Sequence, residues 1–114
     1  MKADRKAVEK ARELIDANQY VLDSSWSDAQ PSPGEENDFL DRNGYDQLSC
    51  WYLGVHEDES DKTKAKLGFP YGDFRRVHRS GLIAAKQRAA QQGYDSVEKA
   101  ADDLLQHLDD VRGD

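Results

Sequence analysis

Large aliphatic and phenyl side chains are scarce in this chain, and their scarcity limits the folds open to it. Leucine, isoleucine, valine and phenylalanine together account for 21 of the 114 residues, while the formal net charge is −7. A chain with less than a fifth of such residues and a high net charge approaches the composition of disordered proteins. Two tryptophans and five tyrosines offset the shortage, because each large ring buries much apolar area. We therefore expect one small domain with a thin core.

Hydrophobic spacing and helix-capping signals predict a mainly α-helical fold. Ser32, Pro33 and Glu35 match an N-cap, a first-turn proline and the glutamate of a capping box. Gly93 is a typical helix stop before a second start at Asp95. The predicted helices cover residues 4–18, 33–43, 45–54, 80–92 and 95–111. We expect four or more helices with at most a short β-hairpin, and leave open whether residues 1–19 form a detachable arm beside a compact domain at 20–114.

The middle of the chain admits two assignments. Aromatic side chains keep helical spacing over residues 45–54, so a helix ending at Gly54 is the first choice and a strand over 51–55 the alternative. An acidic loop follows at 56–61, and residues 62–67 fit a helical turn.

Two glycines flanking an aromatic-proline-aromatic sequence predict a turn at residues 68–73. From Phe74 the helical pattern resumes, with Ser80 as a candidate fresh cap.

The charges are segregated along the chain. Residues 23–61 contain eleven acidic residues and one base, Arg42, whereas residues 62–92 contain eight bases and one acid, Asp73. One interpretation is that the two blocks face each other in the fold. The other is that the basic block binds phosphate groups, or that the acidic block docks on a basic partner. The overall negative charge favours a protein partner over nucleic acid.

The stretch from Asp73 to Gly81 is the strongest candidate for a binding site. It places three arginines within five positions, interleaved with an aromatic and a histidine, which suits phosphate contact or stacking. If the stretch is helical, its arginines project on one side with Lys86. The expected partner-binding residues are Arg75, Arg76, Arg79, Lys86 and Arg88. The competing interpretation is that these arginines pair with the acids of residues 35–46 or 57–61.

Catalytic and metal-binding patterns are weak, so we expect no cofactor, no metal and no catalytic residue. The three histidines lie in separate segments and lack the short spacing typical of metal ligands. Cys50 lies within the aromatic cluster, where a cysteine is usually a small buried hydrophobe. A small enzyme would need a pocket around His78 or Cys50. The single cysteine, the lack of a signal peptide and the absence of a long apolar run predict a cytoplasmic protein with no membrane contact.

The chain also resembles two groups of proteins. Four segments are similar to small uncharacterised bacterial proteins of actinobacterial type, namely Trp51–Gly54, Lys64–Ala85, Asp23–Pro31 and Glu35–Leu40. This resemblance implies no activity. Over residues 66–92 the order Phe-Pro, Asp, Gly-Leu, Ala-Ala and Arg is similar to a helical segment in phage-associated proteins, which implies a phage or mobile-element origin.

The sequence thus predicts a non-enzymatic binding or accessory module that contacts a protein partner through complementary charge. Two alternatives stay open beside the small enzyme. One is nucleic-acid binding through residues 62–92, and the other is a phage-derived accessory or inhibitor protein whose acidic face, residues 23–61, mimics phosphate.

Overall fold

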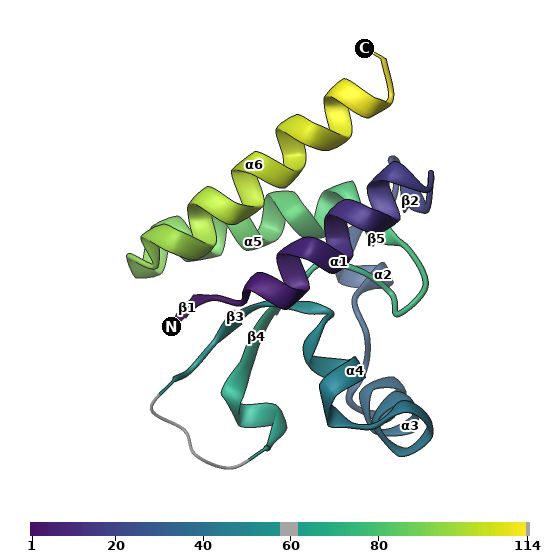
Figure 1. The fold of residues 1–114 in the computed structure, drawn as a ribbon, viewed down its shortest axis with the longest axis vertical. Helices are drawn as coiled ribbons and strands as arrows, with labels where there is room; N and C mark the ends of the chain where they lie inside the picture. The colour runs from purple at the N-terminus through teal and green to yellow at the C-terminus, as the bar shows by residue number, and fades with distance from the viewer. Residues whose placement is uncertain (58–61, 114) are drawn as a thin grey trace.

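The computed structural model describes residues 1–57 and 62–113 (Figure 1). Within them the chain forms six α-helices, five short strands and one 3₁₀ turn. The helices are α1 (Arg5–Asp16), α2 (Trp26–Ala29), α3 (Pro33–Asn43), α4 (Tyr45–Ser49), α5 (Arg79–Gln92) and α6 (Asp95–Val111). The strands are β1 (Lys2–Ala3), β2 (Tyr20–Val21), β3 (Tyr52–Val55), β4 (Leu67–Pro70) and β5 (Val77–His78), and the 3₁₀ turn is η1 (Lys64–Lys66). The mainly helical class is confirmed, with more β-structure than a single hairpin.

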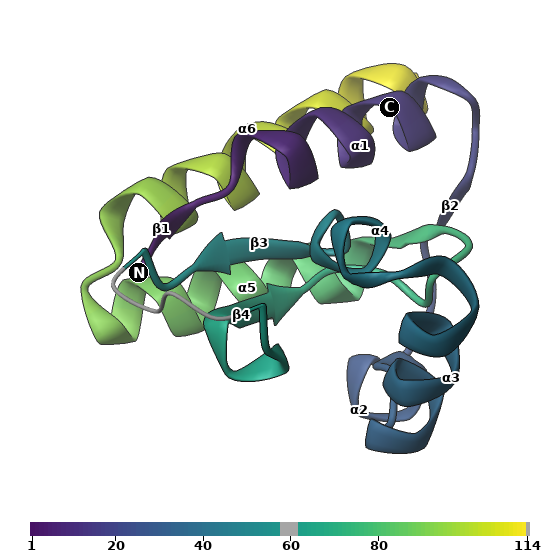
Figure 2. The same cartoon turned by 60° about the horizontal axis from the view of Figure 1, so that its bottom comes forward.

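Three helices pack together through α6. α5 and α6 make a hairpin that turns at Gly93, whose φ of +75° is left-handed as a glycine stop requires. α1 lies alongside α6 in both views (Figures 1 and 2). The fully buried residues of α1 are Ala7, Ala11 and Ile15, and the buried stripe of α6 is Val97, Ala101, Leu104, Leu105 and Leu108. Detachment of residues 1–19 stays a prediction; it would expose the three buried residues of α1 and the part of α6 that they cover.

An antiparallel sheet in the order β1-β3-β4 packs against α1 and α6. Tyr52 pairs with Pro70 and Gly54 pairs with Gly68, while Lys2 pairs with Val55. The expected helix through Gly54 is wrong, because α4 ends at Ser49 and the alternative strand forms instead. The lack of a side chain matters at Gly54, where a Cβ would lie 2.9 Å from the Phe69 ring. The predicted turn at 68–73 is likewise wrong over its first half, which belongs to β4.

A short parallel pair joins β2 to β5, with Tyr20 opposite Val77 and Val21 opposite His78. The expected helix from Phe74 is therefore wrong, since β5 intervenes and α5 begins only at Arg79. Ser80 is not the helix cap either. Its hydroxyl instead lies 2.8 Å from the Ser24 hydroxyl, and the N-cap residue is His78.

The predicted start and end of α3 are confirmed. The Ser32 hydroxyl accepts a hydrogen bond from the Glu35 amide, and the Glu35 carboxylate accepts one from the Ser32 amide. α3 ends at Asn43, and its C-cap residue Gly44 has a φ of +88°. The expected helical turn at 62–67 is reduced to η1, and residues 58–61 of the predicted acidic loop lie outside the described residues.

Aromatic side chains form part of the core. Trp51 is only 4% exposed and stacks on the buried Tyr71, with ring centroids 5.5 Å apart. The Tyr71 hydroxyl donates to the Cys50 carbonyl at 2.7 Å. Phe39 and Leu40 of α3 are partly buried and pack against the same core. None of the helices within the described residues has the length and apolarity that a membrane-spanning segment requires.

Candidate functional site

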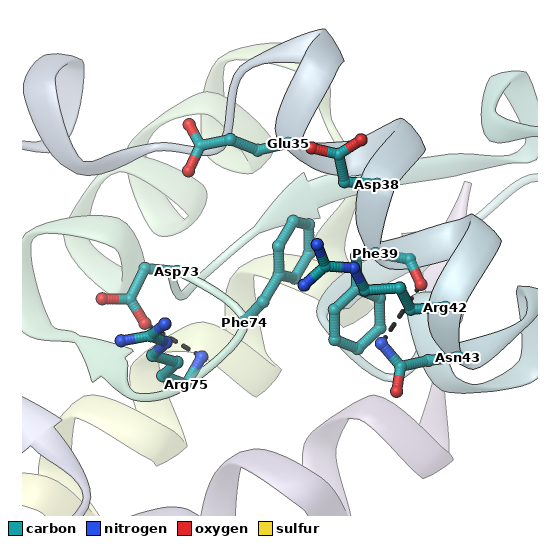
Figure 3. A pocket seen from close by; sticks show the side chains of 8 residues that line it. All are labelled: Glu35, Asp38, Phe39, Arg42, Asn43, Asp73, Phe74 and Arg75. Atoms are coloured by element: carbon teal, nitrogen blue, oxygen red, sulfur yellow. Dashed lines mark hydrogen bonds between the residues drawn. The ribbon is translucent and has the colours of Figure 1, made fainter.

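A groove of about 360 Å³ separates α3 from the turn at residues 72–76 (Figure 3). We call it the α3 groove. Its lining residues are Glu35, Asp38, Phe39, Arg42 and Asn43 from α3, and Asp73, Phe74 and Arg75 from the turn. The groove thus lies between one helix of the acidic block and the start of the arginine-rich stretch.

Asp73 fixes the shape of the turn. One carboxylate oxygen accepts hydrogen bonds from the amides of Arg75 at 3.0 Å and Arg76 at 2.8 Å. The other lies 2.8 Å from Nε2 of His78. Burial raises the pKa of Asp73, but the hydrogen bonds from His78 and the two amides outweigh it and hold the pKa below its ordinary value. Asp73 is therefore a carboxylate whose acceptor sites are occupied within the protein.

Phe74 has a backbone conformation that is rare for its residue type. Its φ is +67°, in the left-handed region that residues with a Cβ adopt at a cost of roughly 1–2 kcal/mol. The ring stacks on Phe39, with centroids 4.6 Å apart, and meets Trp51 edge to face at 5.9 Å. Strained residues persist where the surrounding packing determines them, and they cluster at functional sites. Here the strain places an aromatic ring in the wall of the groove.

The charged side chains of the groove differ in how far they are already engaged. Glu35 is held in the capping box of α3. Within the described part of the chain, no ion pair involves Arg42, Arg75 or Asp38. In Figure 3 the Arg42 side chain points from α3 toward the ring of Phe74. The groove therefore offers two uncommitted cations and one uncommitted anion around a pair of stacked rings.

The five predicted binding residues do not form one surface on a single helix. Arg79 pairs with Asp109 and Lys86 pairs with Asp102, both on α6. Arg75, Arg76 and Arg88 are exposed, and the described residues contain no ion partner for them. The predicted alignment of Arg75 with Arg79 and Lys86 is wrong, because Arg75 precedes β5 and α5. Only Arg75 lines the groove.

Part of the expected pairing between charge blocks is present, but through lysines. Lys62 lies 3.6 Å from Asp46 and Lys64 lies 3.7 Å from Glu36. The interpretation that the arginines pair with residues 35–46 or 57–61 fails for Arg79, since its partner comes from the C-terminal helix.

The sequence did not predict two features of this region. The α3 side of the groove was missed, although Phe39 and Arg42 are spaced three apart and so share a helix face. A hydrogen-bonded chain of Ser24, His78 and Asp73 was also missed. The Ser24 hydroxyl lies 2.7 Å from Nδ1 of His78, which is 54 positions away in the sequence. No local motif signals a chain assembled over such a separation.

Metal binding and cysteine chemistry find no support among the described residues. Among residues 1–57 and 62–113 no three histidine, cysteine, aspartate or glutamate side chains cluster as a metal site. Cys50 donates a hydrogen bond to the Asp46 carbonyl, and burial raises the pKa of its thiol. A raised pKa lowers the fraction of reactive thiolate.

No protein-family model, curated protein or solved structure matches this chain.

Proposed function

We propose that this protein is a docking module that binds a protein partner in the α3 groove. The single observation that carries the proposal is the groove itself, in which stacked Phe39 and Phe74 lie between uncommitted charges of both signs. Aromatic and arginine side chains are enriched where proteins bind one another. The strained backbone of Phe74 supports a binding role, because strained residues cluster at functional sites.

The charges of the groove define the chemistry of the partner. Arg42 and Arg75 would face an acidic group, and Asp38 would face a basic one. The rings between them would hold an aromatic or branched apolar side chain. The partner is thus a protein segment with an apolar residue between an acid and a base. A net charge of −7 opposes long-range attraction to nucleic acid, which supports a protein partner.

A random peptide library displayed against the folded protein tests the proposal. We expect the enriched peptides to carry an apolar residue next to an acidic one. Arg42→Glu and Arg75→Glu should each weaken a selected peptide by at least about tenfold, which is ~1.4 kcal/mol. Arg88→Glu makes the same charge change on α5, away from the groove, and should leave the affinity unchanged. Equal losses in all three variants would contradict the groove as the binding site.

Nucleic-acid binding through residues 62–92 is the competing outcome. Fluorescent single-stranded and duplex DNA, titrated at several salt concentrations, would reveal it. A steep salt dependence that becomes shallower in both Arg88→Glu and Arg75→Glu would replace the docking proposal with a phosphate-binding one.

A further inference from the structure

Three side chains that lie far apart in the sequence form one hydrogen-bonded chain. The Ser24 hydroxyl contacts Nδ1 of His78 at 2.7 Å, and Nε2 of His78 contacts the Asp73 carboxylate at 2.8 Å. His78 is 5% exposed, whereas Ser24 is only partly buried. The hydroxyl of a partly buried serine is therefore linked to a carboxylate through a buried imidazole. This is the order of groups in a serine nucleophile, its base and the acid that orients the base.

The topology explains why these residues meet. β2 and β5 are parallel, so the segments that leave their carboxyl ends emerge at the same edge. Ser24 follows β2, and His78 ends β5. Gly72 bridges to Val77, and the amide of His78 donates to the carbonyl of Tyr71 at 3.0 Å. This tight reversal brings Asp73 back to the far side of the imidazole.

The hydrogen bonds determine which nitrogen of His78 can act as a base. Asp73 is a carboxylate and can only accept, so the neutral imidazole carries its proton on Nε2. Nδ1 then holds a lone pair, which the Ser24 hydroxyl faces as a donor. The roles of the two nitrogens are exchanged relative to the usual arrangement, in which the serine faces Nε2. The direction of proton transfer is the same, from serine to imidazole.

Two further contacts hold the chain in place. The Trp26 ring lies 6.0 Å from the imidazole of His78, tilted by 52°. The Ser80 hydroxyl lies 2.8 Å from the Ser24 hydroxyl and belongs to the first turn of α5. The start of a helix carries partial positive charge, and its first amides have no partner within the helix. Ser80 is thus a candidate donor to negative charge that develops beside Ser24.

We propose that Ser24 is an activated nucleophile that accepts an acyl group from a carboxylic ester. Neither the α3 groove nor a second cavity of about 210 Å³ includes Ser24 or His78 among its lining residues. A substrate that reaches Ser24 therefore need not enter either of these cavities, and the site suits a small ester or one presented on the surface of a larger molecule.

The reaction balances with water as the only co-reactant. The Ser24 oxygen bonds to the ester carbonyl carbon as its proton passes to Nδ1 of His78, and the carbonyl electron pair moves onto oxygen. When the carbon–alkoxide bond breaks, the alkoxide takes the proton from Nδ1 and leaves as an alcohol. Water then attacks the acyl carbon and gives a proton to Nδ1. The bond to the Ser24 oxygen breaks, that oxygen regains the proton, and a carboxylic acid is released.

The test uses a fluorophosphonate probe and p-nitrophenyl acetate on the full chain, with the modified peptide identified by mass spectrometry. We expect covalent labelling at Ser24 and a burst of nitrophenol. Both should disappear in Ser24→Ala and persist in Ser25→Ala, which alters a neighbouring exposed serine that bonds only Ser27 among the described side chains.

The Asp73→Asn variant tests whether Ser24 is activated through His78 and Asp73 or is only accessible to the probe. An amide can donate to His78 and favour the wrong tautomer, so labelling should slow by at least tenfold while circular dichroism confirms the fold. An unlabelled Ser24 in the folded wild type would overturn the proposal, as would labelling of a folded Asp73→Asn variant at the wild-type rate. If Asp73→Asn fails to fold, the comparison of Ser24→Ala with Ser25→Ala decides. Labelling reports on Ser24 and peptide affinity reports on the α3 groove, so the two tests can fail independently.

Discussion

Arg79 and Asp109 face each other across the α5–α6 hairpin as a two-bond fork. Nε of Arg79 donates to one carboxylate oxygen at 3.1 Å, and a terminal guanidinium nitrogen donates to the other at 3.4 Å. The hydrogen bond from Arg79 is the main cause that lowers the pKa of Asp109. The first turn of α5 is therefore tied to the last turn of α6.

This fork should contribute a small, salt-dependent part of the stability. Both side chains are about a third exposed or more, so we expect a coupling of roughly 0.2–1 kcal/mol from a cycle of Arg79→Gln and Asp109→Asn. Urea unfolding at low and high salt measures it, and the coupling should shrink as salt rises. The control is Arg75→Gln with Arg76→Gln, two exposed residues without an ion pair in the described chain, which should leave stability within about 0.5 kcal/mol. A zero coupling at low salt would contradict the prediction.

The carboxylate of Asp73 should make stability depend on acid pH. Its folded pKa lies below the ordinary value of 3.8 that the unfolded chain retains. The stabilisation is therefore complete above the unfolded pKa and is lost as the pH falls through the folded one. Urea unfolding of wild type and Asp73→Asn from about pH 6 to pH 2 checks this. The difference between them should stay constant at higher pH and narrow below about pH 4. A difference that does not change with pH would mean that Asp73 is not held as a carboxylate.

The strain at Phe74 can be measured by comparing two small replacements. Phe74→Ala and Phe74→Gly both remove the ring that stacks on Phe39, but only glycine adopts a φ of +67° without a steric cost. Phe74→Gly should therefore be more stable than Phe74→Ala by roughly 1 kcal/mol. At ordinary helical or extended positions alanine is the more stable, so the opposite order would show that the turn is unstrained.

Replacing a glycine of α5 by alanine should destabilise the protein, whereas replacing one of α3 should not. A Cβ on Gly81 would lie 2.8 Å from the Tyr71 carbonyl oxygen and 2.8 Å from the Trp26 ring. Gly81→Ala should therefore destabilise by roughly 1–3 kcal/mol despite the helical preference of alanine. Gly34, in the first turn of α3, has only the Ser32 hydroxyl at 3.9 Å, so Gly34→Ala should stabilise by roughly 0.5–1 kcal/mol. Thermal unfolding of both variants provides the comparison, and a stabilised Gly81→Ala would contradict this packing.

Helices with their own end signals could be predicted from the sequence. The capping box at Ser32 and the stop at Gly93 are decided by neighbouring residues, so α3 and the end of α5 follow from local chemistry. The 45–55 segment could not be assigned in this way. Its aromatic spacing fits a helix, but pairing of Tyr52 with Pro70 and of Ala3 with Gly54 makes the second half a strand.

The binding and reactive regions were harder to predict, because both depend on one unusual turn. Asp73 satisfies the Arg75 and Arg76 amides with its side chain, and Phe74 takes a conformation that its residue type rarely adopts. Propensity over 74–79 indicates a helix, and tertiary packing overrides it. Ser24 reaches His78 only through the parallel β2–β5 pair, which the sequence pattern does not reveal.

The packing of α1 against α6 has a consequence for the order of folding. The amide of Ala3 donates to the Ser96 hydroxyl, 93 positions along the chain, and the buried face of α1 meets a helix that ends at Val111. During synthesis α1 emerges first, but its apolar side is fully covered only after α6 has been made. Contacts of such sequence separation slow folding, because a long loop must close before they form. A nascent chain halted before residue 95 would thus leave exposed the part of α1 that α6 covers in the folded protein.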